Sequence, residues 1–325
     1  MPRSVSSPAI AGLEFLTGFI LYNCRYKKNG EMGYQMKKIV LLGFALFYLF
    51  ASAGLAVEIP KGLVDSKPDQ AILINLDEWY KTHPSPGKPG IIGETVFASP
   101  RSVVMIRTAG KGTAAGSHFH STTDEIVLVI GGSGELLING KWTPVKAGDI
   151  HVLPRGNVHD ARSPNEDLRF VSVFTPSLPP GGDINTVPAG TVAQIPKGLI
   201  DSKPDQGIIF NLDEWYKTHP SPVKPELVSE TVFASPRSTL MMRTGGKGRV
   251  TTSHYHTVAD EIVLIVGGSG ERLLNGKWTP EKAGDLHVNP RGIIHNSRNP
   301  NEDVQFISIF APQQPPGSDL NAVKD

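Results

Sequence analysis

Apolar positions along most of this chain fall in short alternating runs rather than in helical stripes. Such runs, separated by glycine, proline and asparagine, are typical of β-strands joined by tight turns. In the first half of the chain they lie at 94–97, 103–108, 125–130, 135–138, 149–153 and 168–174. Asn139-Gly140 stands between two of these runs, which is the strongest short hairpin signal. The pattern predicts an all-β fold, an antiparallel sandwich or barrel.

The same pattern occurs twice. Residues 59–176 align without a gap with residues 195–312, and about two thirds of the positions are identical. The shared part includes 75–84, which predicts a short helix ended by proline and which returns at 211–220. Residues 177–193 are rich in proline, glycine and threonine and are typical of a linker. We predict two tandem domains, 57–178 and 194–325, with a linker at 179–193.

The front of the chain is organised differently. Residues 36–56 contain two lysines, an apolar run from 39 to 50 and then small residues, the signature of a secretory signal peptide. We therefore expect translation to start at Met36, a secreted or periplasmic mature protein, and a non-native or disordered extension at 1–35. The alternative is a genuine cytoplasmic extension before an uncleaved membrane anchor.

Composition narrows the choice of partners. The 32 basic residues almost balance the 31 acidic ones, so the net charge of +1 favours neither nucleic acid nor, after signal cleavage, an anionic membrane. The single cysteine, Cys24, precedes both repeats. The repeats therefore have no disulfides and no thiolate ligands, and nitrogen and oxygen must coordinate any metal.

Four potential metal ligands recur at the same offset in both repeats. Three imidazoles and one carboxylate are ligands that a borderline divalent metal prefers. Within a strand, His118 and His120 would point to one face, because side chains alternate. The complete set is His118, His120, Glu125 and His159, repeated as His254, His256, Glu261 and His295.

The spacing around these ligands resembles that of the cupins. The first cupin motif is matched by Gly112-x5-His118-x-His120-x4-Glu125-x6-Gly132, and the second by Gly148-x5-Pro154-x-Gly156-x2-His159. The second repeat matches both motifs and ends the second with Asn299, where the first repeat has Ser163. The resemblance implies a bicupin: two jelly-roll barrels with few short helices, similar to oxalate decarboxylases, germins and cupin dioxygenases.

The resemblance also implies one divalent metal per domain, with Mn(II) or Fe(II) the usual ions and Ni, Zn or Cu as alternatives. No pattern identifies a catalytic residue, but four polar residues are candidates. Arg107 and Arg243 would clamp a carboxylate if they face the cavity, and are surface charges if they face outward. His151 and His287 are candidates for proton transfer, at the barrel mouth or between the modules. Arg155 and Arg291, in turns, are expected to be exposed.

Three kinds of function fit these residues. The first is an exported metal-dependent enzyme of dioxygenase or decarboxylase type, acting on a small oxygen-rich molecule at a three-histidine, one-glutamate metal in each barrel. The second is a non-catalytic, metal-loaded protein that binds or stores a small ligand. The third is a sugar-acid isomerase or lyase. A homo-oligomer is compatible with all three.

Overall fold

The structure is a computed structural model that describes residues 24–28, 31–35, 62–180, 182–188, 198–314 and 319–323. It divides into two compact units, 1–56 and 57–325. In the first unit, β1 (Cys24–Lys28) and β2 (Glu31–Gln35) form an antiparallel pair within the predicted extension. The predicted signal peptide at 36–56 lies outside the described residues. In the described parts of the chain, no helix is long and apolar enough to cross a membrane.

The first repeat folds into a barrel of two antiparallel sheets. One sheet contains the long strands β4 (Gly90–Ala98), β5 (Val103–Gly110), β8 (Asp124–Gly131), β11 (Asp149–Leu153) and β13 (Leu168–Thr175). The facing sheet contains β6 (Thr113–Ala114), β7 (His118–Phe119), β9 (Ser133–Ile138), β10 (Lys141–Lys146), β12 (His159–Ser163) and β14 (Asn185–Thr186). All six predicted runs are strands, so the all-β prediction is confirmed.

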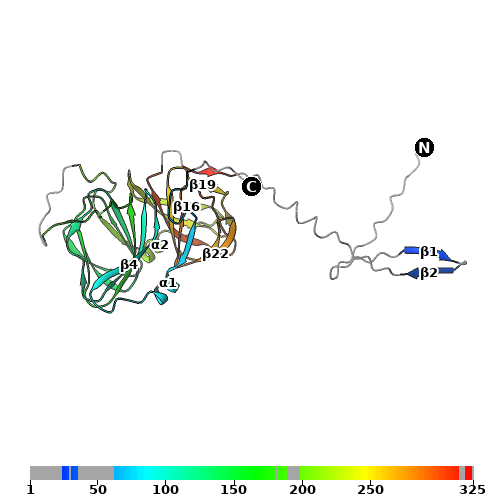
Figure 1. The fold of residues 1–325 in the computed structure, drawn as a ribbon, viewed down its shortest axis with the longest axis horizontal. Coiled ribbons are helices and arrows are strands. Elements are labelled where there is room, and N and C mark those ends of the chain that lie inside the picture. Colours follow the sequence, from blue (N-terminus) through cyan, green and yellow to red (C-terminus); the bar gives the residue numbers. More distant parts are fainter. Residues whose placement is uncertain are drawn as a thin grey trace. The chain divides into compact units, whose positions relative to one another are not determined.

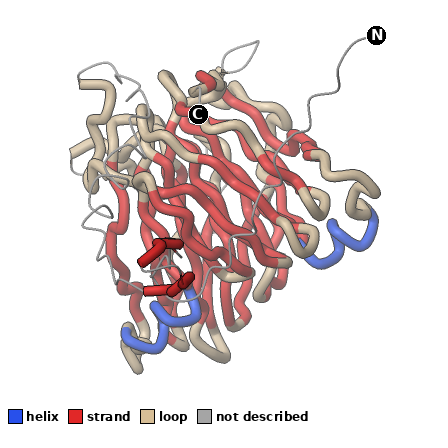
Figure 2. The backbone as a smooth tube through the Cα atoms, turned by 90° about the vertical axis from the view of Figure 1, so that its right-hand side faces the viewer, coloured by secondary structure: helices blue, strands red, loops and turns tan. Residues whose placement is uncertain are grey.

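The second repeat folds in the same way. Its long strands are β16 (Leu227–Ser235), β17 (Ser238–Gly245), β20 (Asp260–Gly267), β23 (Asp285–Asn289) and β25 (Val304–Ala311). The facing strands are β18 (Arg249–Val250), β19 (His254–Tyr255), β21 (Ser269–Leu274), β22 (Lys277–Lys282), β24 (Asn296–Asn299) and β26 (Asn321–Ala322). Strands dominate both barrels, as Figure 2 shows.

The two repeats exchange one strand each. β3 (Ile72–Asn75), from the first repeat, pairs with β23 of the second, and β15 (Ile208–Asn211), from the second, pairs with β11 of the first. In Figure 1, the blue-cyan β3 lies among the yellow and orange strands of the second barrel. One apolar core therefore contains residues of both repeats, among them Ile126 of the first and Ile262 of the second.

The short helices follow the exchanged strands directly. In α1 (Leu76–Thr82), the side chain of Asn75 accepts a hydrogen bond from the Glu78 amide at 3.1 Å, a standard N-cap. The same side chain donates to Asp285 of the other repeat at 2.6 Å. α2 (Leu212–Thr218) repeats this arrangement with Asn211. The helix predicted to end before proline is confirmed, and its cap also fixes the exchanged strand.

Two buried aspartates accept hydrogen bonds and ion pairs from the other repeat. Asp124, which precedes the predicted ligand Glu125, is fully buried and accepts from Ser235 Oγ at 2.5 Å and Arg237 at 3.1 Å, both in the other repeat. Asp260 accepts from Ser99 and Arg101 in the same way.

The turn arginines belong to the same interface between the repeats. Arg155 donates to Leu199 O and Asp201 across the interface, and Arg291 donates to Leu63 O and Asp65. The expected exposure of Arg155 and Arg291 was therefore wrong, because each guanidinium is partly covered by the other repeat.

Candidate metal centres

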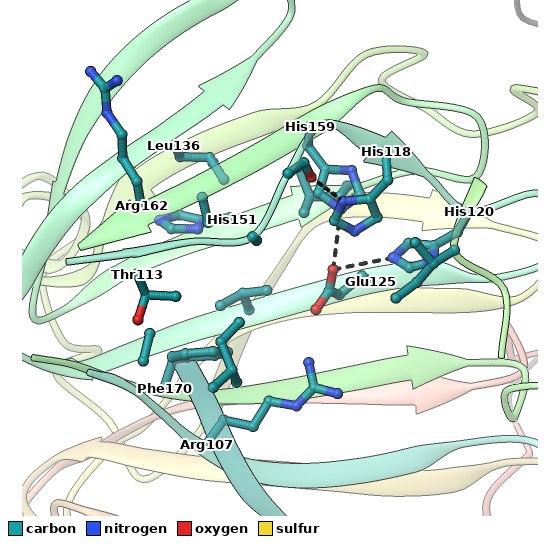
Figure 3. A pocket seen from close by; sticks show the side chains of 18 of the residues that line it. Arg107, Thr113, His118, His120, Glu125, Leu136, His151, His159, Arg162 and Phe170 are labelled. Atoms are coloured by element: carbon teal, nitrogen blue, oxygen red, sulfur yellow. Dashed lines mark hydrogen bonds and ion pairs between the residues drawn. The ribbon is translucent and has the colours of Figure 1, made fainter. Parts of the chain in front are cut away.

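In each barrel, three histidines converge on one point. The ligand nitrogens of His118, His120 and His159 lie within 4.8 Å of one another, as do those of His254, His256 and His295. The structure thus forms two triads that could each hold a metal ion. β7 and β12 of one sheet supply His118 and His159 at directly paired positions. Figure 3 shows the first triad gathered at one end of a cavity.

Backbone carbonyls fix the orientation of all six rings. Nδ1 of His118, His120 and His159 donates to Gly116 O, Asp183 O and Asn157 O at 2.7, 2.9 and 2.9 Å. The second triad repeats this with carbonyls at 2.8–3.0 Å. A carbonyl only accepts, so Nδ1 carries the proton and Nε2 presents its lone pair to the shared point.

The buried Nε2 atoms have no hydrogen-bond partner. This holds for His120, His159, His256 and His295 in the described part of the chain. Buried polar groups are rarely left without a partner, and a metal ion would satisfy several such groups at once. These orphaned nitrogens, all fixed in the ligating tautomer, are the observation by which the site fits a divalent metal.

The predicted carboxylate ligand faces the triad from the other sheet. Glu125, on β8, places Oε2 3.4 Å from Nε2 of both His120 and His159, and Glu261 lies 3.3 Å from His295. Burial alone would raise the pKa of Glu125, but the neighbouring histidines hold it well below its usual range. Burial and His295 lower the pKa of His254 to about 4. Burial also lowers the pKa of His118, whereas Glu125 outweighs burial and raises the pKa of His120.

A further residue supports each triad, and the sequence reading did not single it out. Asp183 lies within the predicted linker, yet its segment returns to the first barrel, where β14 pairs with β7. Its carboxylate accepts hydrogen bonds from the backbone and side chains of Ser121, Thr122 and Thr123 at 2.6–3.2 Å. After the second barrel, the Asp319 carboxylate accepts from the backbone amides of Thr257, Val258 and Ala259 and from the Thr257 hydroxyl at 2.6–3.1 Å. The backbone carbonyl of each aspartate orients one triad histidine, His120 or His256. The carboxylate of the same aspartate anchors the three residues that follow this histidine.

The two candidate arginines face inward. Arg107 lines the cavity and its guanidinium points towards Glu125 in Figure 3, lying 5.3 Å from the Phe174 ring centroid. Arg243 lies 3.6 Å from Glu261, and its Nε has no hydrogen-bond partner. Of the two orientations that the sequence left open, the structure therefore shows the inward one, beside Glu125 and Glu261.

The two candidate histidines lie in the barrel interiors, neither at a mouth nor between the modules. His151 lines the first cavity, burial lowers its pKa to about 4, and its Nε2 has no partner. His287 is fully buried, with Nε2 3.0 Å from Glu281. The expected location was wrong because alternation on β11 and β23 directs Ile150 and Leu286 to the shared core and the histidines inward.

The cavity in the first barrel has a volume of about 250 Å³. The triad, Glu125, Arg107 and His151 form its polar part. Most of the remaining wall is apolar, formed by Val127, Leu136, Val145, Leu153, Leu168 and Phe170. Asp183, Ile184 and Thr186 of the returning segment also line it. The arrangement can seat a small molecule with an apolar body and place its polar end at the metal centre.

Comparison with known proteins agrees with this geometry. Residues 105–174 and 241–310 each match a sequence model described as a cupin domain. Quercetin 2,3-dioxygenase from Bacillus subtilis is 34% identical over 83 residues, which are 24% of this chain and 25% of that protein. An oxalate-binding protein from Thermotoga maritima is 36% identical over 64 residues, which are 19% of this chain and 53% of that protein. The matches thus span a quarter to about half of these relatives.

Solved structures show the fold over a larger part of the chain. A cupin 2 conserved barrel domain protein from Leptotrichia buccalis covers 74% of this chain and 97% of its own, with a TM-score of 0.55 and 16% identity. The match to salicylate 1,2-dioxygenase from Pseudaminobacter salicylatoxidans covers 85% of this chain and 94% of that protein, with a TM-score of 0.55 and 15% identity. At these identities the likeness concerns the fold alone.

Replacing Asp183 by asparagine is expected to lower metal affinity at the first site about 10- to 100-fold, because the Asp183 carbonyl that orients His120 loses its side-chain anchor to residues 121–123. An asparagine amide would place N–H donors against the backbone amides of Thr122 and Thr123. Metal titration with His254→Ala present isolates the first site, and Asp319→Asn with His118→Ala present is the matched variant for the second. Unchanged affinity in both would contradict the assigned role of the aspartates.

Proposed function

Because the chain is a bicupin, with two tandem cupin domains, we propose that its first barrel is a metal-dependent enzyme of dioxygenase type. Its substrate would be a small oxygen-rich molecule with an apolar body. The observation that carries the proposal is the first cavity, where four metal-ligand side chains face apolar walls beside Arg107 and His151. The relatives named quercetin and salicylate dioxygenase support this reaction class. The alternative functions are a decarboxylase, a non-catalytic metal-loaded binding or storage protein, and a sugar-acid isomerase or lyase.

A bound divalent ion, Mn(II) or Fe(II) by family resemblance, supplies Lewis acidity and redox chemistry with dioxygen. The protein residues have separate tasks around it. Arg107, with its fork of N–H donors, pairs with an anionic oxygen of the substrate. His151 is neutral at ordinary pH, so its unpaired Nε2 can accept a proton from a substrate hydroxyl. The apolar walls exclude water and hold the body of the substrate.

Oxygen consumption by the metal-loaded protein, on a panel of phenols, diketones and small dicarboxylates, tests the proposal. We expect turnover of a phenol or diketone that is lost in His118→Ala and retained in His254→Ala. Turnover unchanged in the double variant would exclude a metal-centred reaction. Metal binding without turnover of any compound would favour the binding or storage protein, and turnover without oxygen would favour an isomerase or lyase.

We also propose export, which rests on the lysines and apolar run of residues 36–56. Cleavage after Ala53 or Ala56 would release the two cupin domains outside the cytoplasm. N-terminal sequencing of the native protein is expected to give a mature end near Val57. A native chain that retains residues 36–56 would contradict cleavage and favour the uncleaved anchor.

A further inference from the structure

The two barrels have the same set of candidate metal ligands but differ in the residues around this set. Five positions that line the first cavity are neutral: Thr113, Leu136, Val145, Leu153 and Ala161. The equivalent positions of the second repeat carry Arg249, Arg272, Glu281, Asn289 and Ser297. Paired strands hold both sets in the same register, with Thr113 opposite Ser163 and Arg249 opposite Asn299. The second interior is therefore strongly polar where the first is apolar.

Part of this polar interior is neutralised within the barrel. Arg272 and Glu281 are both 4% exposed, and Arg272 Nε lies 3.0 Å from Glu281 Oε2. His287 Nε2 lies 3.0 Å from the same oxygen. These three side chains form one buried network. The side chains of Arg272 and Glu281 are larger than those of the equivalent Leu136 and Val145, so they leave less room for a ligand.

Arg249 is not neutralised. It is 8% exposed, and its guanidinium donates to Ser297 Oγ at 3.3 Å. In the described part of the chain no carboxylate lies within ion-pair distance of it. Burial, with Arg272 and Arg243 nearby, lowers its pKa to about 10. Such a cation is costly to bury unless a counter-charge comes from elsewhere.

The second barrel is also shaped to accept this arginine. Position 109 is alanine in the first repeat, whereas the equivalent position 245 is glycine. A Cβ at Gly245 would lie 3.3 Å from Arg249 Cδ and 3.4 Å from its guanidinium nitrogen, closer than side chains usually pack. Gly245 thus leaves the space that Arg249 occupies.

Relative to the first barrel, the second barrel carries an excess of one cation before any metal binds. Arg249 and Arg272 have no charged equivalents in the first repeat, whereas Glu281 is the only carboxylate added near them among the described residues. Arg243 and Glu261 repeat Arg107 and Glu125, and Asp319 repeats Asp183. The exposed pairs Arg162–Glu135 and Arg298–Glu271 are the same in both repeats and do not change the comparison. A metal ion would add to the positive charge in each barrel.

From this excess we infer that the second barrel is a separate site for a small organic anion, a mono- or dicarboxylate, held by Arg249 and Arg243 at the metal centre. Guanidinium groups match carboxylates in charge and in planar geometry. The two barrels of one chain thus select different ligands, an apolar-bodied one in the first and a compact anion in the second. The inference rests only on the metal-binding part of the proposed function and requires no turnover.

Calorimetric titration of the full metal-loaded chain with malonate tests the inference. Malonate is expected to bind with one strong site that survives His118→Ala and is lost in His254→Ala. Arg249→Thr introduces the residue that the first repeat has at this position. We expect it to weaken malonate binding about 10- to 100-fold, because one charge-assisted contact is lost. Metal content and thermal unfolding, measured alongside, show that the variant is folded and loaded.

A charge-preserving variant separates anion binding from packing. Arg249→Lys is expected to bind malonate more tightly than Arg249→Thr, with an affinity that falls as salt is raised. Equal affinities for wild type and Arg249→Thr would overturn the inference, as would malonate binding that is lost in His118→Ala and kept in His254→Ala. Malonate binding without oxygen consumption would leave the inference standing and remove only the dioxygenase proposal.

Discussion

Replacing Glu281 by valine, the residue of the first repeat at this position, is expected to lower the free energy of unfolding by about 3–5 kcal/mol. Glu281 is 4% exposed and is the only described carboxylate paired with Arg272. Its loss leaves a guanidinium buried without a counter-charge, and His287 loses a neighbour at 3.0 Å. Chemical denaturation of the metal-free protein, followed by tryptophan fluorescence, measures the change.

The double variant Arg272→Leu/Glu281→Val is the matched control. It gives the second barrel the apolar pair that the first barrel carries as Leu136 and Val145. Removing both charges avoids the uncompensated ion, so we expect a stability within about 1 kcal/mol of wild type, or above it. A double variant as unstable as Glu281→Val would mean that lost packing volume, rather than the unpaired charge, causes the effect.

The same pair makes a pH-dependent contribution. Burial alone would raise the pKa of Glu281, but Arg272 and His287 outweigh it and lower the pKa to about 2 from 4.5. A carboxyl group with a lowered folded-state pKa stabilises the protein above the unfolded pKa and loses that contribution as the pH falls. Wild type should therefore lose more stability than the double variant between about pH 4.5 and pH 2. Parallel pH profiles would contradict this assignment.

Local signals in the sequence were enough to predict the strands and to single out the two histidine triads that the structure brings together. Alternation of apolar residues indicates strands because one face of each strand is buried, and the Asn139-Gly140 hairpin follows from positive φ angles of 51° and 76°. The ligand positions follow from motif spacing. Ser163, the one departure from the motif, donates to the carbonyl of Gly110, as Asn299 does to that of Gly246. The departure therefore preserves the local contact.

Three features of the structure were not predicted from the sequence. Asp183 and Asp319 share the repeat offset, as do Asn185 and Asn321, so extending the alignment past Pro176 would have found them. The differences between Leu136 and Arg272 and between Val145 and Glu281 are visible in the alignment, but only the structure places Leu136 and Val145 on the wall of the first cavity. The strand exchange is a different case.

The exchanged strands have nearly the same sequence, Ile-Leu-Ile-Asn and Ile-Ile-Phe-Asn, and their partners β11 and β23 are equally alike. Each strand can therefore pair with either partner, and no local pattern determines which one it chooses. The choice depends on where the preceding segment lies in three dimensions. The sequence predicted two similar domains, whereas in the structure each barrel needs the other repeat to complete its sheet.

A chain limited to residues 57–193 is therefore expected to form a symmetric dimer rather than a monomer. In the intact protein β3 pairs with β23, and β11 pairs with β15. Without the second repeat, β3 has no β23 and β11 has no β15. A second copy supplies both, because β11 retains Asp149, the equivalent of the Asp285 that binds Asn75. The buried Asp124 would likewise find Ser99 and Arg101 of the other copy, in place of Ser235 and Arg237.

Light scattering of the shortened chain should give twice its sequence mass, with the dimer persisting at low micromolar concentration. The control is Ile74→Asp in the same shortened chain. Ile74 lies on β3 opposite Leu286 and packs against the shared core. A charge there would cost several kcal/mol on burial in each of two symmetric contacts, and we expect this variant to lose the dimer. A stable folded monomer of the unsubstituted shortened chain would contradict this prediction, because β3 would then pair with β11 of its own chain. The strand exchange in the intact protein would in that case result from the covalent link between the two repeats, and not from the unpaired edge of β11.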